Sequence, residues 1–111
     1  MATAVELYNE GDKLKDEGKY EEAIAKFEEA LAQDENYPLA HFALAVVYGR
    51  VGRHLDAVRH GERACELEPD DPFSFTAMSV TYQRAFAGTQ NHDYIRKAED
   101  AMARAHMLQG R

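Results

Sequence analysis

The sequence is poor in cysteine, in long apolar runs and in basic residues. Its single cysteine, Cys65, cannot form an internal disulfide, which fits a reducing compartment. No apolar run approaches the roughly 20 residues that cross a bilayer. The opening MATAVELYNEGD carries acids where a signal peptide carries a basic start and an apolar stretch. We therefore expect a cytoplasmic protein without a membrane partner.

The shortage of basic residues bears on nucleic acid. Lys and Arg number 13 against 20 Asp and Glu, which gives a net charge of −7. Because phosphate binding depends on clustered basic side chains, this balance argues against nucleic acid as the main partner. Residues 1–36 hold 11 acids and 4 lysines (net −7), residues 37–71 hold 6 acids and 4 arginines (−2), and residues 72–111 hold 3 acids and 5 bases (+2). One end of the chain is therefore acidic and the other mildly basic.

Signatures of enzymatic chemistry are missing as well. The sequence has no glycine-rich phosphate loop, no GxSxG, no HExxH and no metal spacing of Cys and His. His54 and His60 are six residues apart and would face different sides of a helix, so they make a poor metal pair. Cys65 is expected to be an inert core thiol, because a reactive thiol needs exposure and positive neighbours. We expect no catalytic residue, no metal and no cofactor, and a small enzyme is the least favoured function class.

What the sequence does contain is helical periodicity. In YEEAIAKFEEALA, apolar residues recur at spacings of three and four, at Tyr20, Ala23, Ile24, Phe27, Ala30 and Leu31. The same spacing recurs at Leu55, Val58, Ala64 and Leu67, and no segment alternates like a strand. The pattern predicts an all-α chain with helices near 3–16, 20–33, 38–50, 54–67, 72–86 and 92–108.

Capping residues support these boundaries. Thr3 and Glu6 form a candidate capping box, and Pro38 and Pro72 suit a first helical position. Glycines fall between the helices of the first two pairs, where a left-handed C-terminal cap is easiest for glycine. Small residues keep a fixed register, because Gly18, Ala23 and Ala30 recur 34 residues later as Gly52, Ala57 and Ala64.

A 34-residue unit of two antiparallel helices resembles the tetratricopeptide repeat. The resemblance covers nearly the whole chain as one domain of three repeats, about 4–37, 38–71 and 72–111, and implies a right-handed solenoid of antiparallel helix pairs. Places that are small or large in that family hold Leu7, Gly11, Leu14, Ala23, Phe27 and Ala30, then Leu44, Ala45, Tyr48, Ala57, Ala64 and Pro69, then Met78, Ser79, Tyr82, Ala98, Met102 and Ala105.

The chain departs from the family pattern at three points. The fourth place of each repeat, where a large residue is usual, holds Ala4, His41 and Phe75, so only the third is conventional. Gly61 replaces the aromatic that Phe27 supplies one repeat earlier, which leaves room that a neighbour must fill or a weakly packed spot. Ala98 lies 41 residues after Ala57, so the third repeat holds seven inserted residues. We favour a longer helix that ends near Gly88 over a longer loop capped by Asn91.

The resemblance also implies a function. In this family the first helix of each repeat lines a concave groove, and aromatic residues with arginine are common at interface centres. We therefore expect a non-catalytic module that binds a protein or peptide, with Phe42 and Phe73 as anchors and Arg50 and Arg84 facing an acidic residue. The expected groove comprises Tyr8, Asn9, Asp12, Leu39, Phe42, Val46, Arg50, Phe73, Thr76, Val80, Gln83 and Arg84.

The resemblance separates this groove from the chaperone-binding members of the family. Those members hold a C-terminal carboxylate with five basic and amide side chains. The corresponding places here are Tyr8, Asp12, Ala43, Phe73 and Ala77, of which none is Lys, Arg or Asn, and Asp12 would repel a carboxylate. We therefore expect that the groove is not a chaperone carboxylate clamp.

Self-assembly is the alternative function. Repeat stacks need a polar cap at each end, and the last predicted helix carries more apolar surface than one neighbour should cover. A symmetric homodimer through the C-terminal repeat would make the chain a scaffold. A head-to-tail contact between the acidic first repeat and the basic third would instead weaken with salt. The self-association residues would be Tyr94, Ile95, Met102 and Leu108.

Overall fold

Six helices make up the computed structural model, which describes residues 2–110. They are α1 (Ala4–Asp16), α2 (Tyr20–Gln33), α3 (Pro38–Arg50), α4 (His54–Leu67), α5 (Pro72–Thr89) and α6 (Asp93–Gln109). No strand occurs in this part of the chain. The prediction of an all-α helical repeat is confirmed, and only α5 departs from its expected bounds by more than one residue. The end predicted for the third repeat, residue 111, lies outside the described residues.

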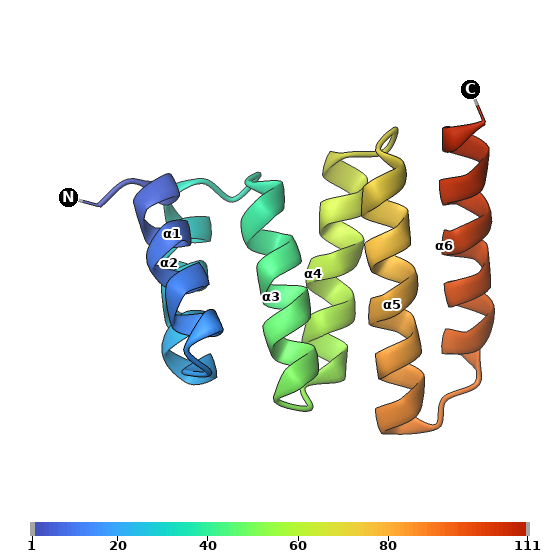
Figure 1. Ribbon diagram of the computed structural model, residues 1–111, viewed down its shortest axis with the longest axis horizontal. Coiled ribbons are helices and arrows are strands. Elements are labelled where there is room, and N and C mark those ends of the chain that lie inside the picture. The colour runs from blue at the N-terminus through green and yellow to red at the C-terminus, as the bar shows by residue number, and fades with distance from the viewer. Residues whose placement is uncertain (1, 111) are drawn as a thin grey trace.

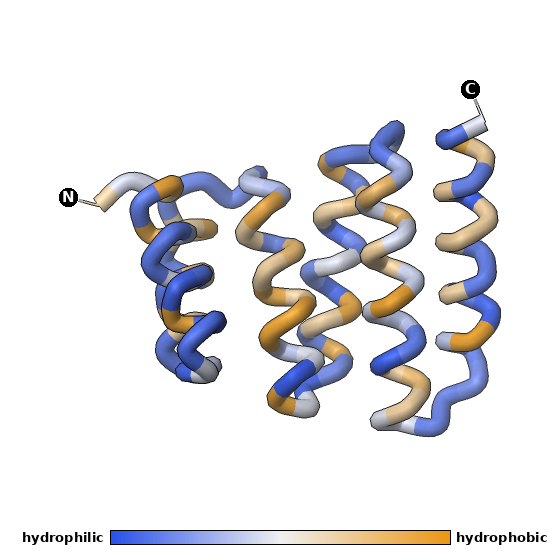
Figure 2. The backbone as a smooth tube through the Cα atoms, viewed as in Figure 1, coloured by the Kyte–Doolittle hydropathy of each residue, from blue (hydrophilic) through white to orange (hydrophobic). Residues whose placement is uncertain are grey.

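The helices form a row of antiparallel pairs with the termini at opposite ends (Figure 1). α3 packs against both α1 and α2, and α5 packs against both α3 and α4, whereas within residues 2–110 the backbone of α6 packs against that of α5 alone. α1, α3 and α5 are therefore the first helices of the three pairs and form one layer. Figure 2 shows the hydrophobic colour most continuous along α3, which is flanked on both sides, and α1 mostly hydrophilic. None of the helices within residues 2–110 has the length and hydropathy needed to cross a membrane.

The helix ends have the expected caps. The Glu6 amide donates to Thr3 Oγ1 at 3.2 Å while the Thr3 amide donates to Glu6 Oε1 at 3.2 Å, a complete capping box. Gly18 and Gly52 lie in the left-handed region, at φ 78° and 84°. The following amide of each donates back across the last helical turn, from Lys19 to Leu14 O and from Arg53 to Tyr48 O. These caps explain why both glycines keep the 34-residue register.

The small residues in register mark where helices touch. Ala23, Ala30 and Ala64 are fully buried. A Cβ at Gly11 would lie 2.7 Å from Phe27 Cε1, so this glycine admits the aromatic ring. The room that Gly61 leaves is filled from α5, since a Cβ there would lie 2.6 Å from Met78 Sδ. Of the two outcomes that the sequence left open at Gly61, a neighbour that fills the space is the one observed, and the weakly packed spot is not.

The seven inserted residues lengthen the helices and leave the loop unchanged. α3 ends at Arg50, and α5 continues five residues beyond the equivalent Arg84 (89 − 84 = 5). α6 begins two residues before the place equivalent to the start of α4 (54 + 41 − 93 = 2). The longer helix predicted near Gly88 is therefore confirmed, with Gln90 as a left-handed cap at φ 61°. Asn91 Oδ1 accepts from the amide of Asp93, the first residue of α6, at 3.1 Å.

Candidate functional site

Three exposed apolar side chains occupy the same place in the three repeats. Val5, Leu39 and Phe73 are spaced 34 residues apart in the first turns of α1, α3 and α5, and their exposed fractions are 57%, 52% and 70%. Equivalent places on helices of one layer face the same way, so the three side chains lie in a row. Val5, Leu39 and Phe73 are called the apolar row below. Large exposed side chains in a row are unusual on a charged surface. The row is therefore the first candidate for a binding surface.

Aromatic packing supports the row. The rings of Phe42 and Phe73 meet edge to face, with centroids 6.5 Å apart and an interplanar angle of 70°. Such a pair contributes about 0.5–1.5 kcal/mol beyond the area it buries. Val80 is exposed and Val46 is half-buried, so they continue the apolar floor along α5 and α3. Both predicted anchors therefore lie together, although only Phe73 is largely exposed.

Tyr8 is more engaged with its own chain than the sequence suggested. Its ring lies 5.7 Å from Phe27 and 5.7 Å from Tyr37, measured between centroids. Burial raises the pKa of the Tyr8 hydroxyl, and the nearby Asp12 carboxylate acts in the same direction. Tyr8 is therefore a protonated, half-buried support for the floor beside α1.

The C-terminal ends of α1 and α3 carry polar side chains. Lys15 Nζ lies 3.0 Å from Asp12 Oδ1 and 3.9 Å from Asp16 Oδ1, and Arg50 Nη1 donates to the Tyr20 hydroxyl at 3.5 Å. A small pocket of about 260 Å³ lies between these groups. Arg84 is exposed and makes no ion pair within residues 2–110.

The remaining predicted groove residues are polar side chains with local roles. The Thr76 hydroxyl donates to Pro72 O at 3.1 Å, and Gln83 Nε2 donates to Ser79 Oγ at 3.2 Å, so both are partly committed within α5. Asn9 is exposed on α1. At the places compared with a carboxylate clamp, Ala43 is buried and Ala77 is half-buried.

The terminal helix only partly matches its predicted role. Ile95 and Met102 line a pocket of about 500 Å³ between α5 and α6. Tyr94 instead stacks on Tyr82, with centroids 6.1 Å apart at 24°, and Leu108 is buried at 8% exposed. Leu108 is therefore not available to a second copy, because α6 itself turns it toward α5. Met107, which the apolar stripe did not mark, is 65% exposed.

The chemistry of Cys65 follows from its burial. Its thiol is buried and donates weakly to Ser74 O at 3.5 Å, and burial raises its pKa to about 11. The thiol is therefore protonated and unreactive at neutral pH. Across residues 2–110, no three His, Cys, Asp or Glu side chains gather as metal ligands would.

Comparison with known proteins identifies the architecture. Residues 11–52 match the sequence profile of the TPR repeat. The second TPR domain of Spaghetti (RPAP3), bound to the HSP90 peptide SRMEEVD, is similar with a TM-score of 0.79 and 22% identity, over 96% of this chain and 92% of that chain. The first TPR domain of Spaghetti (RPAP3), bound to the same peptide, has a TM-score of 0.67 and 18% identity, over 98% of this chain and 94% of that chain. No curated protein sequence matches. Residues 11–52 are therefore similar to the TPR repeat, and the described residues have the fold of the three-repeat TPR domains with which they are compared.

Proposed function

We propose that the face formed by α1, α3 and α5 binds a protein or peptide partner without catalysing a reaction. The observation that carries this proposal is the apolar row of Val5, Leu39 and Phe73. These three exposed apolar side chains lie at equivalent places of one helix layer, and a partner that bound across the layer would remove them from water. The two similar RPAP3 domains, each bound to a peptide, support a peptide ligand for this fold. A cytoplasmic location stays part of the proposal.

The charges along the groove suggest the chemistry of the ligand. The apolar row lies at the start of the helices, whereas Arg50 and Arg84 lie toward the C-terminal ends of α3 and α5. From Leu39 to Arg50 the helix rises about 16 Å, at 1.5 Å per residue. An extended peptide covers that length in about five residues. We therefore propose a ligand with an apolar or aromatic anchor and an acidic residue about five positions away.

Selection from a random peptide library would test this proposal. Enriched peptides should combine an apolar anchor with an acid, and Phe73→Ala should weaken their binding by about 10-fold or more. Burying a phenylalanine contributes about 1.5–3 kcal/mol, which corresponds to that loss. Leu55→Ala is the matched control, because Leu55 is 63% exposed but lies on α4. Peptides that bind the Phe73 variant as tightly as the parent protein would contradict the proposal.

We also propose that the groove is not a carboxylate clamp. Tyr8, Ala43, Phe73 and Ala77 offer no cation at the compared places. Two observations oppose this reading: the similar domains bind an HSP90 peptide, and Lys15 lies 3.0 Å from Asp12 and offsets its charge. The peptide SRMEEVD itself decides the point. We expect no saturable binding, and saturable binding that Lys15→Ala removes would show that the expectation is wrong.

Self-association is the second candidate. α5 packs on the pair α3–α4, but no helix within residues 2–110 packs in the same way on the pair α5–α6. The open pocket there has a volume of about 500 Å³ and is lined by Phe86, Ile95 and Met102 among others. We propose that a second copy covers it. Light scattering during size-exclusion chromatography would show a dimer that Met102→Glu converts to a monomer, and a monomer at all concentrations would refute the proposal. Dissociation in 0.5 M salt would indicate the head-to-tail contact instead.

A further inference from the structure

On the side of the molecule away from the apolar row, a group of four structurally equivalent positions occurs in two successive repeats. Equivalent residues of α2–α3 and α4–α5 are 34 positions apart. Equivalent residues of α4 and α6 are 41 positions apart because of the insertion (98 − 57 = 41). We call Glu28, His41, Tyr48 and His60 the first slot. Their counterparts Glu62, Phe75, Tyr82 and Ala101 are the second slot. The two slots can therefore be compared place by place.

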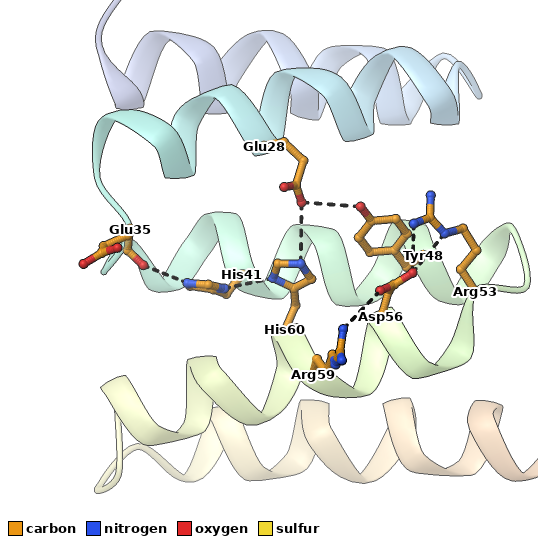
Figure 3. A network of polar contacts seen from close by, with 8 residues as sticks. All are labelled: Glu28, Glu35, His41, Tyr48, Arg53, Asp56, Arg59 and His60. Carbon is orange, nitrogen blue, oxygen red and sulfur yellow. Dashed lines mark hydrogen bonds and ion pairs between the residues drawn. The ribbon is translucent and has the colours of Figure 1, made fainter.

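An imidazole ring fills the first slot (Figure 3). The ring of His60 stacks on Tyr48, with centroids 5.7 Å apart and an interplanar angle of 18°. His60 Nε2 lies 3.5 Å from Glu28 Oε1, which also accepts from the Tyr48 hydroxyl at 3.4 Å. In Figure 3 the Tyr48 ring lies between His60 and Arg53, whose guanidinium lies 4.5 Å from the ring centroid.

The hydrogen bonds of this slot assign the protons on its two imidazoles. His41 Nε2 lies 2.9 Å from the carbonyl oxygen of Glu35, so it must donate. A neutral His41 then accepts at Nδ1, and His60 Nδ1 donates to it across 3.0 Å. A neutral His60 leaves its Nε2 lone pair facing Glu28, and only a protonated His60 would donate there. The neutral imidazole of His60 is therefore held by the Tyr48 ring and by its hydrogen bond to His41, and Glu28 accepts from it only when His60 is protonated.

The second slot keeps the tyrosine and the carboxylate but lacks the ring. The Tyr82 hydroxyl donates to Glu62 Oε2 at 2.6 Å, and burial together with this bond raises the Tyr82 pKa above its ordinary value. Tyr94 stacks on Tyr82 in the place that Arg53 has in the first slot. Ala101 occupies the position equivalent to His60, and its side chain is a single methyl group.

A pocket lies in the second slot at the place that the His60 ring fills in the first slot. Its volume is about 320 Å³, and its lining includes Glu62, Tyr82 and Ala101. That volume lies at the small end of the range for small-molecule sites, about 300–1,000 Å³. Phe75 and Met78 add apolar wall, and the charged side chains of Lys97, Asp100 and Arg104 also line the pocket. Five of the lining residues, Glu62, Phe75, Tyr82, Lys97 and Asp100, are counterparts of residues that lie around His60 in the first slot, and Ala101 is the counterpart of His60 itself.

We propose that the second slot binds a small planar heteroaromatic molecule of the imidazole class, whose ring stacks on Tyr82 and whose N–H donates to Glu62. Glu62 Oε2 accepts from Tyr82, and Oε1 has no partner within residues 2–110, so it can accept a further hydrogen bond. Lys97 and Arg104 line the pocket with Glu62 and Asp100, so the four charges cancel. A neutral ring therefore suits the slot better than a cation. This site is separate from the peptide groove and does not depend on it.

Imidazole itself is the probe for the first experiment. Titrated at pH 8.5, where the imidazole side chain of histidine is neutral, it should shift the amide NMR signals of Tyr82, Lys97 and Ala101 and saturate. 1-Methylimidazole in its neutral form has the same ring without an N–H, and it should bind at least tenfold more weakly. Equal binding of both probes, or no saturable shift with imidazole, would overturn the proposal.

Two variants locate the site. Ala101→His supplies the ring from the chain itself and should abolish the imidazole shifts. Ala103→His is the matched control on the exposed side of α6 and should leave them unchanged. His60→Ala should open the first slot, so that imidazole binds there too and raises the melting temperature of that variant. Imidazole shifts that persist in a folded Ala101→His variant would place the binding elsewhere and refute the assignment.

Discussion

Two glycine-to-alanine changes should have opposite effects on stability. Gly11 lies in the middle of α1, and a Cβ there would lie 2.7 Å and 2.8 Å from two ring carbons of Phe27. Phe27 is fully buried in the main core cluster with Ile24 and Leu44, so its ring has no space to retreat. Gly49 lies near the end of α3, where the nearest atom to a new Cβ is Arg84 Cδ at 3.9 Å, an ordinary contact.

The magnitudes follow from two competing effects. Alanine in place of glycine favours a helix by about 0.5–1 kcal/mol. Overpacking a closed core costs about 1–3 kcal/mol. For Gly11→Ala the second effect is larger, so we expect a net loss of about 1–2 kcal/mol in the free energy of unfolding. For Gly49→Ala only the first effect acts, near a helix end, so we expect a gain of about 0.5 kcal/mol.

Thermal unfolding followed by circular dichroism at pH 7.5 would measure both changes. For a domain of about 100 residues, 1 kcal/mol corresponds to roughly 4 °C. Gly11→Ala should lower the melting temperature by about 4–8 °C, and Gly49→Ala should raise it by about 2 °C. Urea unfolding should give the same order with an unchanged slope. If Gly11→Ala were as stable as the parent protein, the close approach of Phe27 would not be what requires glycine there.

Three further predictions concern single side chains. Burial lowers the pKa of His60 despite the nearby Glu28. Its neutral form therefore stabilises the fold above the unfolded pKa, and that contribution is lost as pH falls through the folded pKa. His60→Asn should reduce the drop in melting temperature between pH 7.5 and 5.5, and an unchanged drop would contradict this assignment. Cys65, whose pKa burial raises to about 11, should react with a thiol reagent at pH 8 at least 100-fold more slowly in the folded protein than in guanidinium. Thr3→Ala should remove the capping box and cost about 1 kcal/mol of stability in urea unfolding.

The sequence predicted most of what depends on neighbours along the chain. Gly18 and Gly52 mark helix ends because a left-handed cap is a local property. Ala23 and Ala57 mark helix contacts because their spacing repeats with the fold. The extension of α5 past Arg84 could also be predicted, since a register shift must be taken up in a helix or a loop.

Contacts between distant elements could not be predicted in the same way. Gly61 left a gap, but the sequence could not show that Met78 would fill it, because that depends on the rotamer of a flexible side chain. Leu108 was expected on the surface and is buried, since a small change in the rotation of α6 decides which stripe meets α5. The pairing of His41 with His60 also depends on how α3 and α4 cross.

The sparse core of α1 makes the N-terminal repeat the place where local unfolding should begin. α1 buries only Leu7 and Gly11, whereas α3 buries seven residues. In an array whose units contact only their neighbours, an end unit can open without the rest. Amide hydrogens of α1 should therefore exchange with solvent sooner than those of α3. Because the apolar row crosses α1, α3 and α5, a ligand that spans it would also hold the first repeat closed, so protection of α1 would report occupancy of the groove.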